Sequence, residues 1–248
     1  MLISVLPAQA IAESISTPRE EGGQVSSQES QTQGTEPENV DGVAGDLATG
    51  ERHYLDNGLV LELNGDGKSF AVVDFMNVQA TSVRIPDSYL GLHITRIGDL
   101  AFKGKISVQE VVLSDNIQHI GDDVFSGCAN LRSLEEHGAK YISSASNPYF
   151  YLLSAANQSI TACTISEQTK IVASYAFYNC KQLTEIVIPD SVIQVGFRSL
   201  RGCDSLQSVT LPFAGEVENG QVNNHVGFVF GARTYGGNIS FVPTTLTS

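Results

Sequence analysis

Four cysteines carry the side chains with which this sequence could most readily do chemistry. Three of them recur at the same position of a repeated pattern, namely Cys128, Cys180 and Cys203, whereas Cys163 lies outside that position. A zinc site needs two closely spaced pairs of ligands, and the sequence contains neither Cys-x-x-Cys nor His-x-x-x-His. We therefore predict no metal site and expect the three repeated thiols to be buried as small apolar groups. A disulfide between neighbouring repeats stays open as an alternative.

The histidines, hydroxyls and glycines give no recognisable catalytic pattern either. Five histidines are scattered along the chain, at His53, His93, His119, His137 and His225. None lies in a nucleophile, zinc or phosphate-binding motif, and neither Gly-x-Ser-x-Gly nor a Walker-type loop occurs. The stretch 62–67 looks like the start of a calcium loop, but its twelfth position is Val73 where a bidentate glutamate is needed, which favours a hairpin turn. We predict no catalytic residue and no cofactor.

The charge balance excludes several classes of partner. The sequence has 27 acidic and 14 basic residues, which gives a formal net charge of −13. Coulomb repulsion then opposes binding to nucleic acid or anionic lipid, so we predict no nucleic-acid partner. No run of about 18 apolar residues occurs, which predicts that no segment inserts into a membrane.

The N-terminal region divides into two segments that differ from the rest of the chain. Residues 1–12 combine a short apolar run with Ala8-Gln9-Ala10, a pattern typical of a signal-peptidase site, and we interpret them as a truncated signal-peptide-like segment. Residues 13–52 are rich in Ser, Gln and Glu and poor in large apolar side chains, which predicts a disordered acidic linker. The sequence therefore predicts export, with a merely flexible N-terminus as the alternative.

From residue 53 onward apolar positions return, first as a hairpin expected within 53–80 and then as an internal repeat within 81–248. One unit reads Ile-x-x-Ile-Gly-x-x-Val-Phe-x-x-Cys-x-x-Leu over 117–131, and related units occupy 169–183 and 192–206. Short alternating strands lie between the units, and Pro189 and Pro212, which follow two of them, are 23 residues apart. Such a period with one short strand per unit predicts a solenoid in which neighbours share one core.

Stacking of the units should align equivalent apolar side chains in internal columns. The strands supply two columns, Val83, Val111, Ile186 and Val209 in one and Ile85, Leu113, Ile165, Ile188 and Leu211 in the other. A third column holds Phe102, Phe125, Phe177 and Leu200. Glycine precedes this column at Gly98, Gly121 and Gly196, but Ala173 takes the same position, so a positive φ is not required there.

These repeated residues resemble the BspA-like leucine-rich repeats of bacterial surface proteins, from about residue 59 to the end of the chain. The resemblance implies an α/β-type, right-handed leucine-rich-repeat solenoid of about five to six units, mainly β, with a short strand and a turn or short helix in each. Residues 135–162 and 213–241 look like the irregular insertions of such arrays. Members of the family often run much longer, so we expect that the chain is a fragment or lacks its C-terminal cap.

The resemblance also implies a function in binding rather than catalysis. We expect a secreted or cell-surface protein that adheres to host or neighbouring-cell proteins through an exposed sheet face. Alternation along the strands turns one set of side chains outward and brings charged residues beside it. The candidate binding face consists of Arg84, Glu110, Val112, Arg132, Glu185, Val187 and Thr210.

Two other functions stay open. The array could be a structural or targeting module of a larger secreted enzyme, which the complete reading frame would reveal. It could also bind a glycan through exposed aromatic rings, for which Tyr149 and Tyr151 are the candidates. The predicted face is mixed in charge and poor in aromatic residues, which favours an extracellular protein of the host or of bacteria over a glycan.

Overall fold

A computed structural model describes residues 47–231 of the chain. Residues 1–46 and 232–248 lie outside the described part. The predicted signal-peptide-like segment, most of the acidic linker and the end of the second insertion fall there, so these assignments stay predictions.

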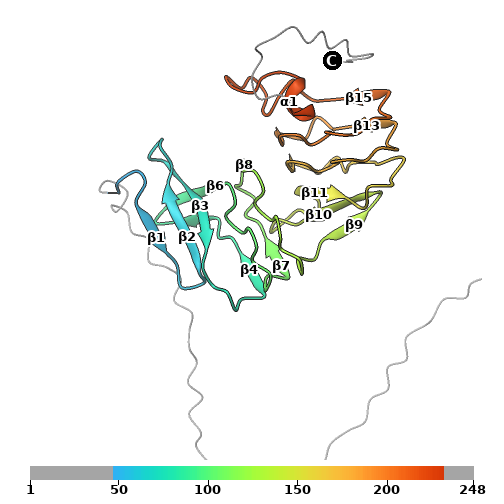
Figure 1. The fold of residues 1–248 in the computed structure, drawn as a ribbon. Coiled ribbons are helices and arrows are strands. Elements are labelled where there is room, and N and C mark those ends of the chain that lie inside the picture. The colour runs from blue at the N-terminus through green and yellow to red at the C-terminus, as the bar shows by residue number, and fades with distance from the viewer. Residues whose placement is uncertain (1–46, 232–248) are drawn as a thin grey trace, which may run out of the picture. The chain divides into compact units, whose positions relative to one another are not determined.

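The first half of the described chain forms a six-stranded sheet, called here the N-terminal sheet (Figure 1). Its strands follow the order β1-β2-β3-β6-β5, and β8 pairs with β6 as well. Their bounds are β1 (Arg52–Tyr54), β2 (Leu59–Leu63), β3 (Ser69–Phe75), β5 (Ser88–Tyr89), β6 (Leu92–Ile97) and β8 (His119–Ile120). β2 and β3 are antiparallel around the turn 64–68, which is the hairpin that the sequence predicts. From β3 onward, β6 and β8 continue the sheet in parallel.

The second half contains a five-stranded sheet, called here the C-terminal sheet, in the order β14-β12-β11-β10-β9. Its bounds are β9 (Leu134–Glu136), β10 (Ala139–Ile142), β11 (Tyr151–Ala155), β12 (Ile171–Val172) and β14 (Gln194–Val195). β11, β12 and β14 are parallel, and β12 and β14 come from successive repeats. β9 and β10 form an antiparallel hairpin at the start of the predicted insertion, which also contains β11. The insertion therefore adds strands of its own to the sheet.

Two further pairs of short parallel strands come from the alternating segments between the units. The first strand pair is β4 (Ser82–Arg84) with β7 (Glu110–Val112), and the second is β13 (Glu185–Val187) with β15 (Ser208–Thr210). In the second pair Ile186 lies opposite Val209, an offset of 23 residues that equals the predicted repeat length. The register of the repeats is thus visible in the backbone pairing.

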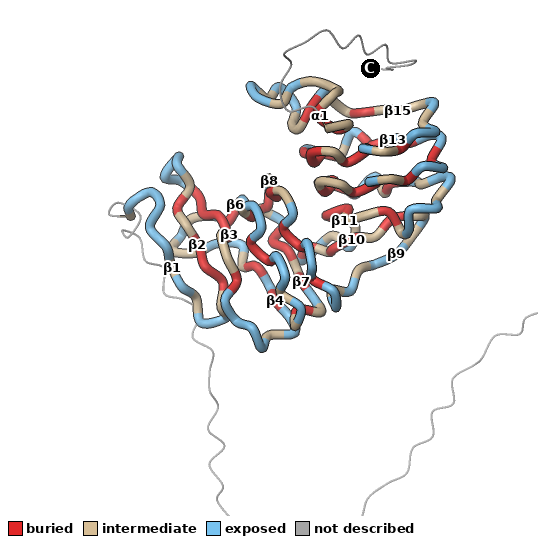
Figure 2. Tube along the Cα trace, viewed as in Figure 1, coloured by how far each residue is buried: buried red, intermediate tan, exposed pale blue. Residues whose placement is uncertain are grey.

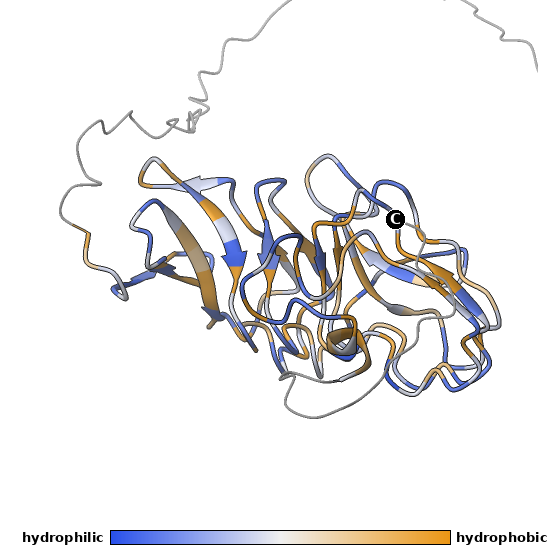
Figure 3. Ribbon diagram, turned by 90° about the horizontal axis from the view of Figure 1, so that it is seen from above, coloured by the Kyte–Doolittle hydropathy of each residue, from blue (hydrophilic) through white to orange (hydrophobic). Residues whose placement is uncertain are grey.

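The predicted apolar columns form the core, and buried residues occupy successive turns of the array (Figure 2). In the first column Val209 is the exception, because it is half-buried. The aromatic column has one more member at its N-terminal end than predicted, namely Phe75. Phe75 stacks on Phe102 and Phe102 on Phe125, with ring centroids 5.3 and 5.4 Å apart. Hydrophobic and hydrophilic segments are interspersed along the array when it is viewed from above (Figure 3).

Turns, rather than helices, connect the strands. Within residues 47–231 the structure has one helix, α1 (Gly227–Phe230), and the chain is otherwise mainly β. A left-handed residue recurs at one position of each unit, at Leu100, Asp123, Tyr175 and Arg198. A second left-handed position follows four residues later, at Gly104, Gly127, Asn179 and Gly202. The sequence predicts either a turn or a short helix in each unit, and the structure has the turn.

The insertion interrupts the ladder of strands after β8. Among the described strands β8 pairs with β6 alone, so the N–H and C=O of Ile120 have no strand partner on the other side. The side-chain amide of Gln194, which lies 74 residues away, replaces that partner. Ile120 N–H donates to Gln194 Oε1 over 2.8 Å, and Gln194 Nε2 donates to Ile120 C=O over 3.0 Å. A buried amide side chain thereby caps an open sheet edge.

Candidate interaction surface

The structure divides the predicted binding face into two groups. Arg84, Glu110 and Val112 lie on the first strand pair, with Arg132 beside it, and Glu185, Val187 and Thr210 lie on the second strand pair. Arg84, Glu110, Arg132, Glu185 and Val187 are exposed, whereas Val112 and Thr210 are half-buried. The residues of the insertion interrupt the ladder between the two pairs.

The first group borders a hollow of about 330 Å³ at the edge of β7. Glu110 and Arg132 line it together with residues of the β9–β10 hairpin, among them Leu134 and Tyr141. The position of Arg132 is fixed, because its Nη2 donates to Gln109 Oε1 over 3.0 Å. Opposite charges therefore stand beside an apolar hollow, an arrangement suited to a polar-rimmed protein contact.

The second group borders a separate hollow of about 310 Å³. Glu185 and Val187 line it from β13, and Cys163 and Ile165 line it from the end of the insertion. Val187 is 47% exposed, which makes it an apolar side chain presented to solvent at the end of β13. Thr210 does not line this hollow and lies beside Val187 in register.

A larger groove of about 720 Å³ lies on the N-terminal sheet, and no motif in the sequence predicts it. It extends from the β2–β3 turn across β6 to β8. Its lining residues are polar or charged except for one glycine: Asn64, Gly65, Asp66, Lys68, Ser69, His93, Thr95, Arg96, Gln118 and His119. Three separated segments of sequence supply them, which is why no linear motif marks the groove.

The aromatic residues suggested for glycan binding do not line a groove. Tyr151 is 3% exposed and belongs to the core, so its assignment as a glycan-stacking residue is wrong. Burial raises the pKa of its hydroxyl. Tyr149 is half-buried, its ring packs edge-on against Tyr141, and its hydroxyl donates to Glu136 Oε2 over 2.6 Å. Tyr151 and the next residue, Leu152, are both buried at the start of β11, so this strand does not alternate between buried and exposed positions there.

All four cysteines are free thiols, and the three repeated ones are buried as predicted. Cys128 Sγ donates to the carbonyl of Phe102, and Cys203 Sγ donates to that of Phe177, each over 3.0 Å. Burial raises the pKa of the Cys203 thiol to about 11 and that of Cys163 to about 12. A thiol with so high a pKa is a poor nucleophile at neutral pH, which fits a packing role.

Beside the large groove, a half-buried carboxylate anchors the second insertion. Glu216 Oε1 lies 3.2 Å from His119 Nε2, and its Oε2 accepts a hydrogen bond from Asn223 Nδ2 over 2.8 Å. The hydrogen bond from His119 contributes most to lowering the pKa of Glu216 below its ordinary value of 4.5, against the opposing effect of burial. The carboxylate is thus held in its charged form.

The described part of the chain offers no cluster for metal chemistry. Over residues 47–231, no group of three or more His, Cys, Asp or Glu side chains is arranged to hold a metal ion. No helix in that range is long and apolar enough to cross a membrane.

Comparison with protein families identifies the repeat. The model of the BspA type leucine-rich repeat region matches residues 69–156 and 153–219, with six copies. The match covers more than half of the chain, which therefore belongs to this family. The predicted resemblance and the predicted leucine-rich-repeat solenoid are confirmed. The comparisons indicate no enzyme family.

Solved structures with a similar fold are bacterial leucine-rich repeat proteins. The Treponema pallidum protein TpLRR is 20% identical, with a TM-score of 0.41 over 66% of this chain and 74% of its own. A protein of Bacteroides capillosus is 19% identical, with a TM-score of 0.36 over 64% and 96%. A leucine-rich cell surface protein of Faecalibacterium prausnitzii is 16% identical, with a TM-score of 0.33 over 66% and 55%. No curated protein gives a significant match.

Proposed function

We propose that this chain is an exported, non-catalytic binding protein that adheres to extracellular proteins of a host or of neighbouring cells. The observation that carries the proposal is the alignment of outward-facing side chains, exposed or half-buried, in rows across stacked repeats. Arg84 lies in register with Val112 on the first strand pair, and Val187 with Thr210 on the second. Stacked repeats of this kind create extended binding surfaces without requiring a deep pocket.

The chemistry of these rows supports a protein partner. Exposed charges of both signs, Arg84 and Glu110, lie on the first strand pair. On the second strand pair the exposed acid Glu185 lies on the same strand as the exposed apolar side chain of Val187, and both line one hollow. A protein interface typically combines an apolar centre with a polar rim, and charged rims steer association. Export is supported by the signal-peptidase-like pattern at Ala8-Gln9-Ala10 and by the resemblance of the repeats to those of bacterial surface proteins.

The test is binding of the full chain to immobilised matrix proteins, mucins, glycans and whole bacterial cells. A face variant carries Arg84→Ala, Glu110→Ala and Glu185→Ala. A matched control removes one base and two acids elsewhere on the exposed surface, by Lys181→Ala, Asp204→Ala and Glu218→Ala. We expect saturable binding to at least one protein, lost in the face variant and kept in the control.

Either of two results would contradict the proposal. One is the absence of saturable binding to any protein at high micromolar concentrations of the full chain. The other is equal binding by the face variant and the control, which would show that the strand rows do not make the contact.

A further inference from the structure

The large groove on the N-terminal sheet concentrates positive charge in a chain whose net charge is negative. Among its ten lining residues are Lys68, Arg96, His93 and His119, against one acid, Asp66. The chain as a whole carries a formal charge of −13. Counting histidine as neutral, as in that formal charge, the lining still carries two positive charges against one negative. A concave site with an excess of one sign of charge focuses the electrostatic potential and attracts the opposite charge.

The repeat itself places two of these groups side by side. Arg96 on β6 lies in register with His119 on β8, and the two strands are parallel. His93, at the other end of β6, lies in register with Ser69, one residue after Lys68. The basic side chains therefore converge from three neighbouring segments onto one sheet face.

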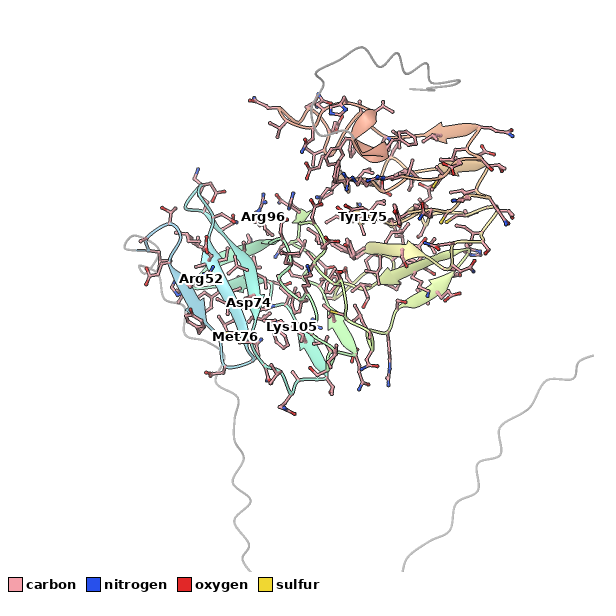
Figure 4. The ribbon with its side chains drawn as sticks, viewed as in Figure 1. Arg52, Asp74, Met76, Arg96, Lys105 and Tyr175 are labelled. Atoms are coloured by element: carbon pink, nitrogen blue, oxygen red, sulfur yellow. The ribbon has the colours of Figure 1, made fainter. Side chains whose placement is uncertain are left out.

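The two positive charges of the groove that do not depend on histidine protonation, Arg96 and Lys68, are not neutralised by ion pairs. Over residues 47–231, ion pairs join Lys105 to Asp74 and His119 to Glu216, among others, but none involves Arg96 or Lys68. Figure 4 shows Arg96 beside β6, apart from the pair formed by Asp74 and Lys105. The one acid of the lining, Asp66, is engaged in its own turn, where its Oδ1 accepts the backbone N–H of Lys68 over 2.8 Å.

The remaining lining residues discriminate between anionic ligands. Asn64, Thr95 and Gln118 supply amide and hydroxyl groups that can bond a peptide backbone. No Phe, Tyr or Trp lines the groove, so the platform on which sugar rings stack is missing. An exposed guanidinium matches the two oxygens of a carboxylate in a bidentate hydrogen bond.

We propose that this groove binds an acidic segment of a partner protein, with Arg96 and Lys68 holding its Asp or Glu carboxylates. This inference rests on the proposed function and adds the chemistry of the partner. It assigns the N-terminal sheet a second contact, distinct from the two strand pairs.

The experiment measures fluorescence anisotropy of a labelled poly-glutamate peptide titrated with the full chain, beside poly-glutamine of equal length. The diagnostic variant is Arg96→Gln. The matched control is Arg201→Gln, which removes the same charge from an exposed position outside the groove and outside the strand pairs. We expect poly-glutamate alone to bind, Arg96→Gln to weaken it about tenfold, and Arg201→Gln to change it less than about twofold.

Three outcomes would overturn the inference. Poly-glutamate could bind no better than poly-glutamine, or both arginine variants could weaken binding equally, which would indicate diffuse attraction instead of a site. A uronic-acid oligosaccharide could also bind more tightly than poly-glutamate with the same dependence on Arg96, which would assign the groove to an acidic glycan.

The panel of extracellular proteins separates this inference from the proposed function. If a protein of the panel binds through the strand rows and poly-glutamate does not bind, the groove assignment alone is wrong. If no protein of the panel binds, the proposed function is wrong whatever the peptide does.

Discussion

The N-terminal and C-terminal sheets use the same position of the repeat in opposite ways. On β6 and β8 this position holds Arg96, which is exposed, and His119, which is half-buried. On β12 and β14 it holds Ile171 and Gln194, which are 1% and 2% exposed. The strands are equivalent in register, so the difference does not come from the repeat.

The difference comes from contacts between repeats that are not neighbours. Gln194 bonds the open edge of β8 through Ile120, Ser174 Oγ donates to Asp122 Oδ1 over 2.5 Å, and His119 pairs with Glu216. These contacts bury Gln194 in the C-terminal sheet and engage His119 on β8, whereas Arg96 on β6 stays exposed. Repeat register thus determines which side chains point inward, whereas packing beyond the repeat determines which outward side chains remain accessible.

The aromatic column should be the feature that both sheets share, and its loss should have the largest effect. Phe177→Ala removes a fully buried ring and should lower the free energy of unfolding by about 3–5 kcal/mol, as should Phe102→Ala. Urea denaturation followed by circular dichroism measures both. Tyr178→Ala, at a neighbouring ring that is 39% exposed, is the control and should cost less than about 1 kcal/mol. A small loss at only one of the two phenylalanines would show that the column is not shared.

A matched pair of glycines should show next how tightly individual turns of the array pack. A Cβ on Gly196 would lie 2.1 Å from the backbone N of Ser174, whereas one on Gly98 would meet nothing closer than Val72 O at 3.4 Å. Gly196→Ala should therefore destabilise the fold by about 2–4 kcal/mol, and Gly98→Ala should change stability by less than about 0.5 kcal/mol. Thermal melting of the two variants measures the contrast. Equal melting temperatures would refute the difference in packing between the two turns.

The pair between His119 and Glu216 should make a smaller contribution to the free energy of unfolding, and this contribution should depend on pH. The pKa of Glu216 is lowered in the fold, so its contribution to stability is present above 4.5 and is lost as the pH falls through the folded value. Glu216→Gln should be less stable than the parent chain near pH 6 and should converge with it near about pH 3. Denaturation curves measure the difference in unfolding free energy between Glu216→Gln and the parent chain. An equal difference at the two pH values would contradict this prediction. Glu218→Gln, at an exposed acid on the same insertion, is the control.

Much of the fold could be predicted from sequence because its signals are local and repeated. A period of 23 residues and alternation within strands are sufficient to identify the columns that contain Ile186 and Phe177. The recurrent left-handed positions at Leu100 and Tyr175 could not be predicted, because these residue types rarely adopt a positive φ. Closure of the turns by neighbouring repeats, rather than local preference, imposes that conformation.

The candidate surfaces were less accessible to sequence reasoning. Alternation identified exposed positions such as Arg84 and Val187, but it could not reveal that the insertion separates them into two groups. The basic groove combines Lys68, Arg96 and His119 from three segments, so no spacing in the sequence links them. The role of Gln194 depends on a strand edge 74 residues away, which only the geometry of the insertion leaves open.

One measurement tests the central claim that equivalent repeat positions have become structural in one sheet and accessible in the other. It compares the free energies of unfolding of Gln194→Ala and Arg96→Ala in urea. We predict a loss of about 2–3 kcal/mol for Gln194→Ala, because the buried N–H and C=O of Ile120 lose their partners, and less than about 0.5 kcal/mol for Arg96→Ala. Equal losses in the two variants would contradict the claim.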